Sequence, residues 1–328
     1  MKTTILSLFS GAGGLDLGFK KAGFKIVLSN DNDKSIQETY KYNFPNTKHL
    51  SKSITKLSKR DINFKIAGII GGPPCQSWSE AGALRGIEDS RGKLFFEYIR
   101  ILRDKRPAFF LAENVSGILM QRHREAFQFI LGQFANLGYS ISFELLNAKN
   151  YGVPQDRKRV IIVGYHQLTG DFFEFPNVSK ESPVLKDAIG DLGEPEGTKS
   201  VALTDLEFPN HEYMTGDFSP MYMSRNRVRS WNEPSFTIQA GARHAPIHPQ
   251  APKMIPVERD KKIFAPGKEH LYRRLSVREC ARIQTFPDEH TFSYERIANG
   301  YKMVGNAVPV KFAEYLARKI FSDFKGEG

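Results

Sequence analysis

Short apolar runs alternate with segments of helical spacing along the first 166 residues. The apolar runs, which are of β type, occupy residues 5–9, 25–29, 67–70, 108–112, 139–146 and 159–164. Helical spacing fills residues 15–22, 34–42, 93–102 and 122–137. This alternation predicts a doubly wound α/β sheet. Ligands of such sheets bind beyond the carboxyl ends of the strands, so residues that directly follow these runs are the first candidates for a site.

The alternation stops near residue 172, where prolines, glycines and polar residues begin to interrupt shorter runs. We interpret residues 171–270 as a second, smaller and irregular domain. Helical spacing returns at residues 276–284 and 310–324. We expect the last helix to pack on the first domain, which would then comprise residues 1–170 and 271–328.

Composition is that of an ordinary globular chain, with 40% hydrophobic and 25% charged residues. No apolar stretch reaches the roughly 18 residues that a membrane span needs, so we expect no membrane partner. The sequence has only two cysteines, Cys75 and Cys280, and no zinc-type spacing. We therefore expect no metal site and a reducing compartment such as the bacterial cytoplasm.

The formal net charge is +11, and much of it is local. Thirteen Lys or Arg and five Asp or Glu fall between residues 221 and 282. A nucleic-acid partner explains such a block, because phosphate contacts dominate nucleic-acid affinity. The plainer alternative is a basic face that is merely solvated.

Cys75 follows two prolines on a loop at the end of the apolar run 66–70. Prolines fix the backbone before it. A structural cysteine is more often found inside an apolar run, whereas a thiol presented by a rigid polar loop is typical of a nucleophile.

A glycine-rich turn, Phe9-Ser10-Gly11-Ala12-Gly13-Gly14, joins the first strand to the first helix. Asp16 stands where a dinucleotide fingerprint needs its third glycine, so the turn suits a cofactor without a pyrophosphate. Asp31 ends the second β run, where an acid can accept hydrogen bonds from ribose hydroxyls. The alternatives are a purely structural turn and, for Asp31, a helix N-cap.

Glu113 follows the strongly apolar run Phe109-Phe110-Leu111. A carboxylate at a buried strand end is expensive unless it has a partner or a role. Alternation puts Arg157 and Arg159 on one side of the run that begins near residue 159. They could pair with a carboxylate, a pyrimidine carbonyl or a phosphate, or they could form a solvent-exposed basic stretch.

Taken in order, these motifs resemble those of the cytosine-C5 DNA methyltransferases over nearly the whole chain. Four motifs lie in the first domain: the turn 9–14, Gly72-Pro73-Pro74-Cys75-Gln76, Glu113-Asn114-Val115 and Gln155-Asp156-Arg157-Lys158-Arg159. Two more follow the irregular domain, at residues 274–288 and 300–309. The resemblance implies the Rossmann-like mixed sheet of S-adenosylmethionine-dependent methyltransferases, with a target-recognition domain.

The resemblance also implies a mechanism. Cys75 would attack carbon 6 of a cytosine flipped out of double-stranded DNA, and carbon 5 would then take a methyl group from S-adenosyl-L-methionine. Glu113 would stabilise N3 and the amino group of the cytosine as charge develops on the ring. Arg159 would hold the pyrimidine carbonyl and keep Glu113 in place, and Arg157 beside it would belong to the same catalytic group.

By the same resemblance, the cofactor would contact Phe9, Gly11, Ala12, Gly13, Gly14, Leu15, Asp31, Asn32, Ser53, Ile54, Pro73, Leu94, Asn306 and Ala307. Three residues depart from the family pattern. Asn32 and Ser53 replace a large apolar residue and an aspartate at the adenine, and Ala67 replaces an aspartate before the nucleophile strand. These departures predict weaker cofactor binding without loss of the bond-making groups.

Arginines cluster in the irregular domain, and their forked donors match the edge of guanine. The alternative is contact with phosphates only. The segment resembles GGCC-specific modification enzymes, which implies that Arg225, Arg227 and Arg243 read guanines and that the inner cytosine is methylated. Gln76 and Ser79 would also contact DNA. A cognate restriction endonuclease is then an expected functional partner, and a monomer is the default assembly. A tRNA cytosine methyltransferase and a catalytically silent DNA-binding module remain as alternatives.

Overall fold

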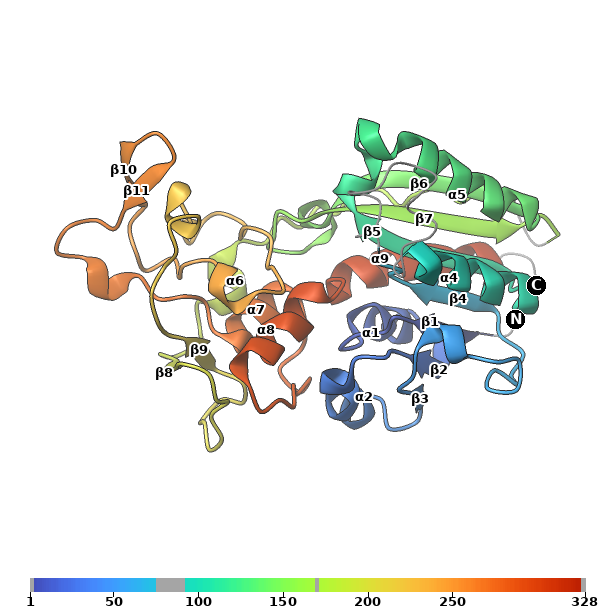
Figure 1. The fold of residues 1–328 in the computed structure, drawn as a ribbon, viewed down its shortest axis with the longest axis horizontal. Coiled ribbons are helices and arrows are strands. Elements are labelled where there is room, and N and C mark those ends of the chain that lie inside the picture. Colours follow the sequence, from blue (N-terminus) through green and yellow to red (C-terminus); the bar gives the residue numbers. More distant parts are fainter. Residues whose placement is uncertain (1–2, 75–91, 169–170, 326–328) are drawn as a thin grey trace.

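The computed structural model describes residues 3–74, 92–168 and 171–325. Within this part of the chain, seven strands form one mixed sheet in the order β3-β2-β1-β4-β5-β7-β6. Figure 1 shows the sheet and its helices in one lobe, which holds both chain ends, and a less regular lobe at the other end. The predicted α/β fold is therefore confirmed.

Strands β1 to β5 run parallel and β7 runs antiparallel to both of its neighbours. Buried apolar side chains explain why the central strands read as nearly continuous apolar runs. The strands are β1 (Thr4–Leu8), β2 (Lys25–Asn30), β3 (Lys48–Leu50), β4 (Gly68–Gly71), β5 (Phe109–Val115), β6 (Tyr139–Asn147) and β7 (Lys158–His166).

Helices cover both faces of this sheet. One hydrophobic cluster includes apolar side chains of α1 (Gly14–Lys21) and α9 (Val310–Lys325). A second cluster on other sheet residues includes those of α4 (Gly92–Lys105) and α5 (Arg124–Asn136). The α1 and α9 backbones approach closely, because a Cβ added at Gly18 would lie 2.5 Å from that of Ala313. The last helix thus packs on the first lobe, as its apolar spacing predicts.

Two expectations about the elements need correction. The run predicted to end at residue 112 continues to Val115, because β7 pairs with β5 along its whole length, so Glu113 lies inside a strand rather than after one. The helix expected over residues 34–42 is a 3₁₀ turn, η1 (Lys34–Ile36), followed by α2 (Gln37–Asn43). Sequence spacing did not predict β3 or the helix α8 (Ile297–Asn306).

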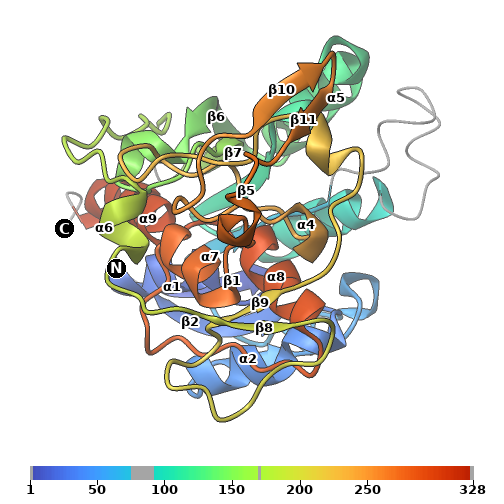
Figure 2. The same ribbon diagram turned by 90° about the vertical axis from the view of Figure 1, so that its left-hand side faces the viewer.

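The second lobe is held by short elements and loops. It contains α6 (Leu185–Ile189), β8 (Glu196–Thr198), β9 (Glu212–Met214), β10 (Ile255–Glu258), β11 (Lys261–Ile263) and three 3₁₀ turns, η7 (Tyr222–Ser224), η8 (Ala242–His244) and η9 (Glu269–Leu271). Strands β10 and β11 form a hairpin at the end farthest from the chain termini (Figure 1). Figure 2 shows this lobe face on, with α7 (Val277–Ile283) and α8 behind the loops.

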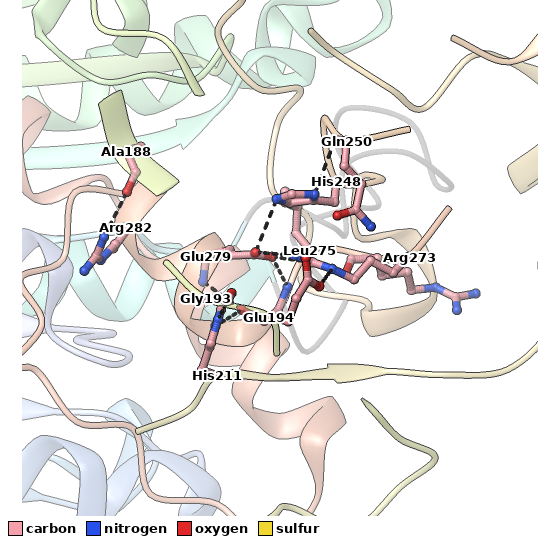
Figure 3. A network of polar contacts seen from close by, with 12 residues as sticks. Ala188, Gly193, Glu194, His211, His248, Gln250, Arg273, Leu275, Glu279 and Arg282 are labelled. Carbon is pink, nitrogen blue, oxygen red and sulfur yellow. Dashed lines mark hydrogen bonds and ion pairs between the residues drawn. The ribbon is translucent and has the colours of Figure 1, made fainter. Parts of the chain in front are cut away.

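Helix α7 lies at the joint between the two lobes. It packs against α6 and β9 as well as α8. Glu279 receives two hydrogen bonds from Arg273, at 2.8 and 2.9 Å, and lies 3.6 Å from Nε2 of His248 (Figure 3). Although burial raises the pKa of Glu279, the Arg273 guanidinium outweighs this and keeps that pKa below its ordinary value. The ion pair therefore fixes the segment just before α7 to α7 itself, with His248 of the second lobe beside it. The domain boundary at residue 270 remains a prediction.

Candidate active site

A cavity of about 620 Å³ opens at the carboxyl ends of the parallel strands. The loops after β1, β2 and β4 line it, together with the end of β5 and the α8 segment. Of the predicted cofactor residues, the lining includes Phe9, Gly11, Ala12, Gly14, Leu15, Asp31, Asn32, Pro73, Asn306 and Ala307. This is the edge where an open α/β sheet binds ligands.

The glycine-rich turn brings the backbone to the cavity wall. Phe9, Gly11 and Gly13 have φ of 55°, 53° and 87°, a region that glycine enters without strain. A Cβ at Gly13 would lie 2.2 Å from the Phe44 ring, and one at Gly14 would lie 2.3 Å from the carbonyl oxygen of Val308. These two glycines are therefore required by packing, whereas a Cβ at Gly11 would meet only open space.

Asp31 faces the same cavity from the end of β2. Its carboxylate accepts hydrogen bonds from the backbone N–H groups of Gly11 and Asp33, both at 2.9 Å. Burial raises its pKa despite these two bonds. The cap of the following turn is Asp33, whose side chain accepts from the Ser35 backbone. The helix-cap interpretation thus belongs to Asp33, and Asp31 has acceptor capacity left toward the cavity.

Four predicted cofactor residues are not on the cavity wall in the described part of the chain. Ser53 caps the turn η2 (Ile54–Lys56) and bonds Thr55. Ile54 is buried in the core, and Leu94 packs against the same cluster. Gly13 lies behind the wall against Phe44. The structure instead adds Lys302 and Met303 from α8, and Lys302 forms an ion pair of 2.7 Å with Asp33.

Glu113 and Arg159 form an ion pair beside the cavity. The Nε atom of Arg159 lies 2.7 Å from Oε1 of Glu113, and both side chains are largely buried. Glu113 lines the cavity, and a Cβ at Gly72 would approach its other carboxylate oxygen to 3.1 Å. Register explains the pairing, because Arg159 is opposite Val115 on the antiparallel neighbour of β5.

Asn114 holds the loop that precedes the predicted nucleophile. Its side-chain amide donates to the carbonyl oxygen of Pro73 at 3.0 Å. Strand β5 therefore presents Glu113 and fixes the Pro73-Pro74 loop through adjacent residues. The motif Glu113-Asn114-Val115 does not by itself indicate this role for Asn114, because the contact depends on how the Pro73-Pro74 loop lies against β5. Cys75, Gln76 and Ser79 lie outside the described residues.

Arg157 occupies a different environment from Arg159, although we grouped both as catalytic. It is 1% exposed, and its guanidinium donates to the carbonyl oxygens of Ile238, Gly305 and Ala307 at 2.9–3.0 Å. Burial, with the nearby charge of Arg159, lowers its pKa to about 9. Arg157 thus forms a buried connection between the sheet, the second lobe and the α8 segment.

Comparison with known proteins decides the family. The model of the family described as C-5 cytosine-specific DNA methylase matches residues 3–322. The chain belongs to this family. It is 56% identical to the type II methyltransferase M.MthTI of Methanothermobacter thermautotrophicus over 99% of both chains. It is 53% identical to M.FnuDI of Fusobacterium nucleatum, covering 96% of this chain and 93% of the relative.

Solved structures agree on the fold of the methyltransferase. A DNA modification methyltransferase encoded within an Escherichia coli prophage matches with a TM-score of 0.75 and 23% identity, over 98% of this chain and 99% of that one. The DNMT2 protein of Spodoptera frugiperda matches with a TM-score of 0.69 and 20% identity, over 97% and 99%. At this identity the likeness concerns the fold alone.

The predicted guanine-reading arginines of the methyltransferase lie in the second lobe. Arg225 and Arg243 are exposed, and Arg243 belongs to η8. Arg227 is half-buried and donates to the carbonyl oxygens of Tyr222 and Met221 at 2.9 and 3.3 Å. The role of Tyr222 is not predictable from the sequence, since one tyrosine in an irregular segment carries no spacing signal.

The described residues contain neither a metal-binding cluster nor a helix that could span a membrane. Within residues 3–74, 92–168 and 171–325, no group of three or more His, Cys, Asp or Glu side chains could hold a metal ion. None of the helices described in these ranges is long and apolar enough to cross a membrane.

Proposed function

We propose that this methyltransferase transfers a methyl group from S-adenosyl-L-methionine to carbon 5 of the inner cytosine in GGCC duplex DNA. The observation that carries the proposal is the ion pair of Arg159 with Glu113, because Glu113 and Asp31 both line the cavity. Glu113 and Arg159 would thus bind the cytosine at one part of the cavity, and Asp31 would accept hydrogen bonds from the ribose of the cofactor at another.

The described residues fit S-adenosyl-L-methionine. Asp31 is largely buried, faces the cavity and retains acceptor capacity for hydroxyl donors. The backbone at Gly11 is open to a ligand, and the volume of about 620 Å³ falls within the range of small-molecule sites. The sulfonium group of this cofactor supplies an electrophilic methyl group. Asp31, the turn residues and the α8 segment would hold it beside the Pro73-Pro74 loop.

In the proposed reaction, the Cys75 thiolate adds to carbon 6 of the cytosine, and the ring's π electrons move to carbon 5. Carbon 5 forms its new bond to the methyl group, and the electron pair of the broken carbon–sulfur bond stays on the donor sulfur. The carbon-5 proton then leaves to a base, β-elimination breaks the bond to Cys75, and aromaticity returns. A thiolate is needed for the first step, and nearby positive charge favours it.

Glu113 and Arg159 would act on the ring during this sequence. The Glu113 carboxyl would bond N3 and the amino group as charge builds on the ring. Arg159 uses Nε for Glu113 and one Nη1 N–H for the Lys158 carbonyl, which leaves donors for the pyrimidine oxygen. Because these atoms are inaccessible in a duplex, the cytosine must be flipped out of the stack.

Specificity for GGCC rests on Arg225, Arg227 and Arg243, whose forked donors suit the O6/N7 edge of guanine. The relatives quoted above are named type II methyltransferases. We therefore assign the same role to this enzyme, the protection of host DNA from a cognate restriction endonuclease, and we expect it to act as a cytoplasmic monomer.

The test uses tritiated S-adenosyl-L-methionine with three substrates. These are a GGCC duplex, a GCGC duplex of the same flanking sequence, and a folded tRNA transcript. We expect label on the GGCC duplex alone. Label on GCGC would overturn the specificity. Label on the tRNA alone would support the tRNA methyltransferase, and no label with intact duplex binding would support the silent DNA-binding module.

A further inference from the structure

Two of the proposed reading arginines lie on separate segments that meet at one tyrosine. Arg227 follows the turn η7, which begins at Tyr222, and Arg243 belongs to η8. Each segment is too short to fix a long side chain by itself. Reading two adjacent guanines requires both guanidinium groups to be correctly placed at the same time. A residue that supports both arginines would therefore affect recognition of both bases.

The ring and backbone of Tyr222 hold Arg227. The guanidinium carbon lies 4.6 Å from the centroid of the Tyr222 ring, within the range of a cation–π contact. Nε of Arg227 donates to the Tyr222 carbonyl at 2.9 Å, and Nη2 donates to the Met221 carbonyl at 3.3 Å. Two of the five N–H donors are thereby used, and three are left for a base.

The hydroxyl of Tyr222 holds the segment of Arg243. It donates to the carbonyl oxygen of Ala245 at 2.6 Å, and the Ala245 N–H donates to the Ala242 carbonyl across η8. Arg243 lies between these two residues. The backbone of the Arg227 segment is fixed close by, because the Ile247 N–H donates to the Arg227 carbonyl at 3.0 Å.

Tyr222 itself is rigidly supported and is 1% exposed, so it is not positioned to touch DNA. Its ring lies 5.0 Å from that of Phe218, centroid to centroid. The Arg274 guanidinium lies 4.0 Å from the Phe218 ring and donates to the carbonyls of Met214, Gly216 and Asp217. The support therefore extends from the reading arginines to the segment that leads into α7.

We infer that Tyr222 is a positioning residue for sequence recognition, which places Arg227 through its ring and Arg243 through its hydroxyl. The inference rests on the proposed function, in which these arginines read guanines. A free arginine side chain loses rotamer freedom when it binds. Holding both guanidinium groups in place before binding reduces this entropy cost for the correct bases. It also prevents the groups from moving to form hydrogen bonds with a wrong base.

The test compares Tyr222→Phe and Tyr222→Leu with wild type. The substrates are a GGCC duplex and duplexes with one base pair replaced at each guanine position. The measurements are kcat and KM on each duplex and the Tm of each protein. Arg227→Ala and Arg243→Ala identify the base pair that each arginine reads.

Tyr272 provides the matched control, as Tyr272→Phe and Tyr272→Leu. It lies in the same small core, stacks on Phe264 at 4.1 Å and bonds the Ala265 N–H through its hydroxyl. Its substitution disturbs the core to a similar degree without removing a contact to Arg227 or to Ala245 that the described structure contains.

Preference here is the ratio of kcat/KM on GGCC to kcat/KM on a duplex with one base pair replaced. We expect Tyr222→Phe to lower this ratio by about tenfold at the same base pair that Arg243→Ala affects, which is the scale of one guanine contact. Tyr222→Leu should relax both positions, mainly through KM, while the Tyr272 variants keep the wild-type preference. If Tyr222→Leu does not fold, Tyr222→Phe decides the question.

Two results would overturn the inference. One is a loss of rate on all duplexes by the same factor in the Tyr222 variants. The other is an equal loss of preference in the Tyr272 variants, which would indicate a general effect of the core. If Arg227→Ala and Arg243→Ala themselves left the preference unchanged, the proposed readout would fail instead. If they changed it and the Tyr222 variants did not, only the positioning role would fail.

Discussion

Arg157 and Arg159 are two residues apart in the sequence, but their surroundings indicate different roles. Arg159 faces a carboxylate at the cavity, whereas Arg157 satisfies three backbone carbonyls in a fully buried site. A lysine in either place keeps the positive charge but loses the planar fork. Parallel lysine substitutions can therefore separate chemistry from structure.

We predict that Arg159→Lys lowers kcat by roughly 10- to 100-fold, because the proposed donor to the pyrimidine oxygen is lost. The free energy of unfolding should change little. Arg157→Lys should instead lower that free energy by about 1–3 kcal/mol, since an ammonium group cannot reach all three carbonyls. Urea titrations and single-turnover methyl transfer measure the two effects. A normal urea midpoint with a large loss of kcat in Arg157→Lys would restore Arg157 to the catalytic group.

The two acids of the site were predictable from the sequence, whereas the difference between the two arginines was not. Glu113 and Asp31 were identifiable because each is an acid at the end of an apolar run. Arg157 was not separable from Arg159, because its burial depends on Ile238 and on residues 305–307, far away in the chain. The cavity contacts of Lys302 and Met303 likewise depend on how α8 returns to the sheet.

At the scale of elements, the α/β alternation was predictable, and two short or atypical elements were not. Strand β3 has three residues, which is too short to show a period. Helix α8 contains Gly300 and Gly305, which are poor helix formers. Gly300 sits against the ring of Tyr294, and Gly305 against the backbone of Gln239. Gly300 therefore reflects close packing against the segment just before α8, and Gly305 close packing against a segment distant in sequence.

Gly305 gives a direct test of this packing. A Cβ there would lie 2.3 Å from the backbone carbonyl of Gln239, so Gly305→Ala must push α8 away from the second lobe. We predict a lower Tm and weaker binding of both S-adenosyl-L-methionine and duplex DNA. The control is Gly132→Ala in α5, where a Cβ meets nothing within 4 Å. It should raise the stability by about 0.5–1 kcal/mol. Equal effects of the two variants would contradict the account.

His290 links pH to the stability of the cofactor turn. Its Nε2 lies 3.1 Å from the Ala12 carbonyl oxygen, and burial lowers its pKa from 6.5 to about 4. Between these values the unfolded chain binds the proton and the folded chain does not. The stability from this residue is therefore present above pH 6.5 and is lost as pH falls toward 4.

We predict that the difference in free energy of unfolding between wild type and His290→Gln shrinks by roughly 1–2 kcal/mol from pH 7 to pH 5. The difference is the useful quantity, because burial raises the pKa of Asp16 to about 6, which acts in the opposite direction in both proteins. Urea titrations at the two pH values measure it. A difference that stays constant would show that His290 titrates normally in the folded protein.

At the scale of the whole molecule, basic residues are concentrated in the part of the sequence that contains the proposed guanine-reading arginines. The net charge is +11, and residues 221–282 carry thirteen basic against five acidic side chains. Binding that displaces counterions from DNA weakens steeply with salt. We predict that affinity for a GGCC duplex falls by roughly two orders of magnitude between 50 and 200 mM salt. A nearly flat dependence, measured by fluorescence anisotropy, would argue against extensive phosphate contact.

The most direct test of the central claim is to trap the enzyme on its target base. A GGCC duplex with 5-fluorocytosine at the inner cytosine cannot lose a proton from carbon 5 after methyl transfer, so β-elimination is blocked. We predict a covalent complex with this duplex in the presence of S-adenosyl-L-methionine, with Cys75 as the modified residue in peptide mass spectrometry. Cys75→Ala should form none. A complex at the outer cytosine, on a GCGC duplex, or through Cys280 would contradict the account.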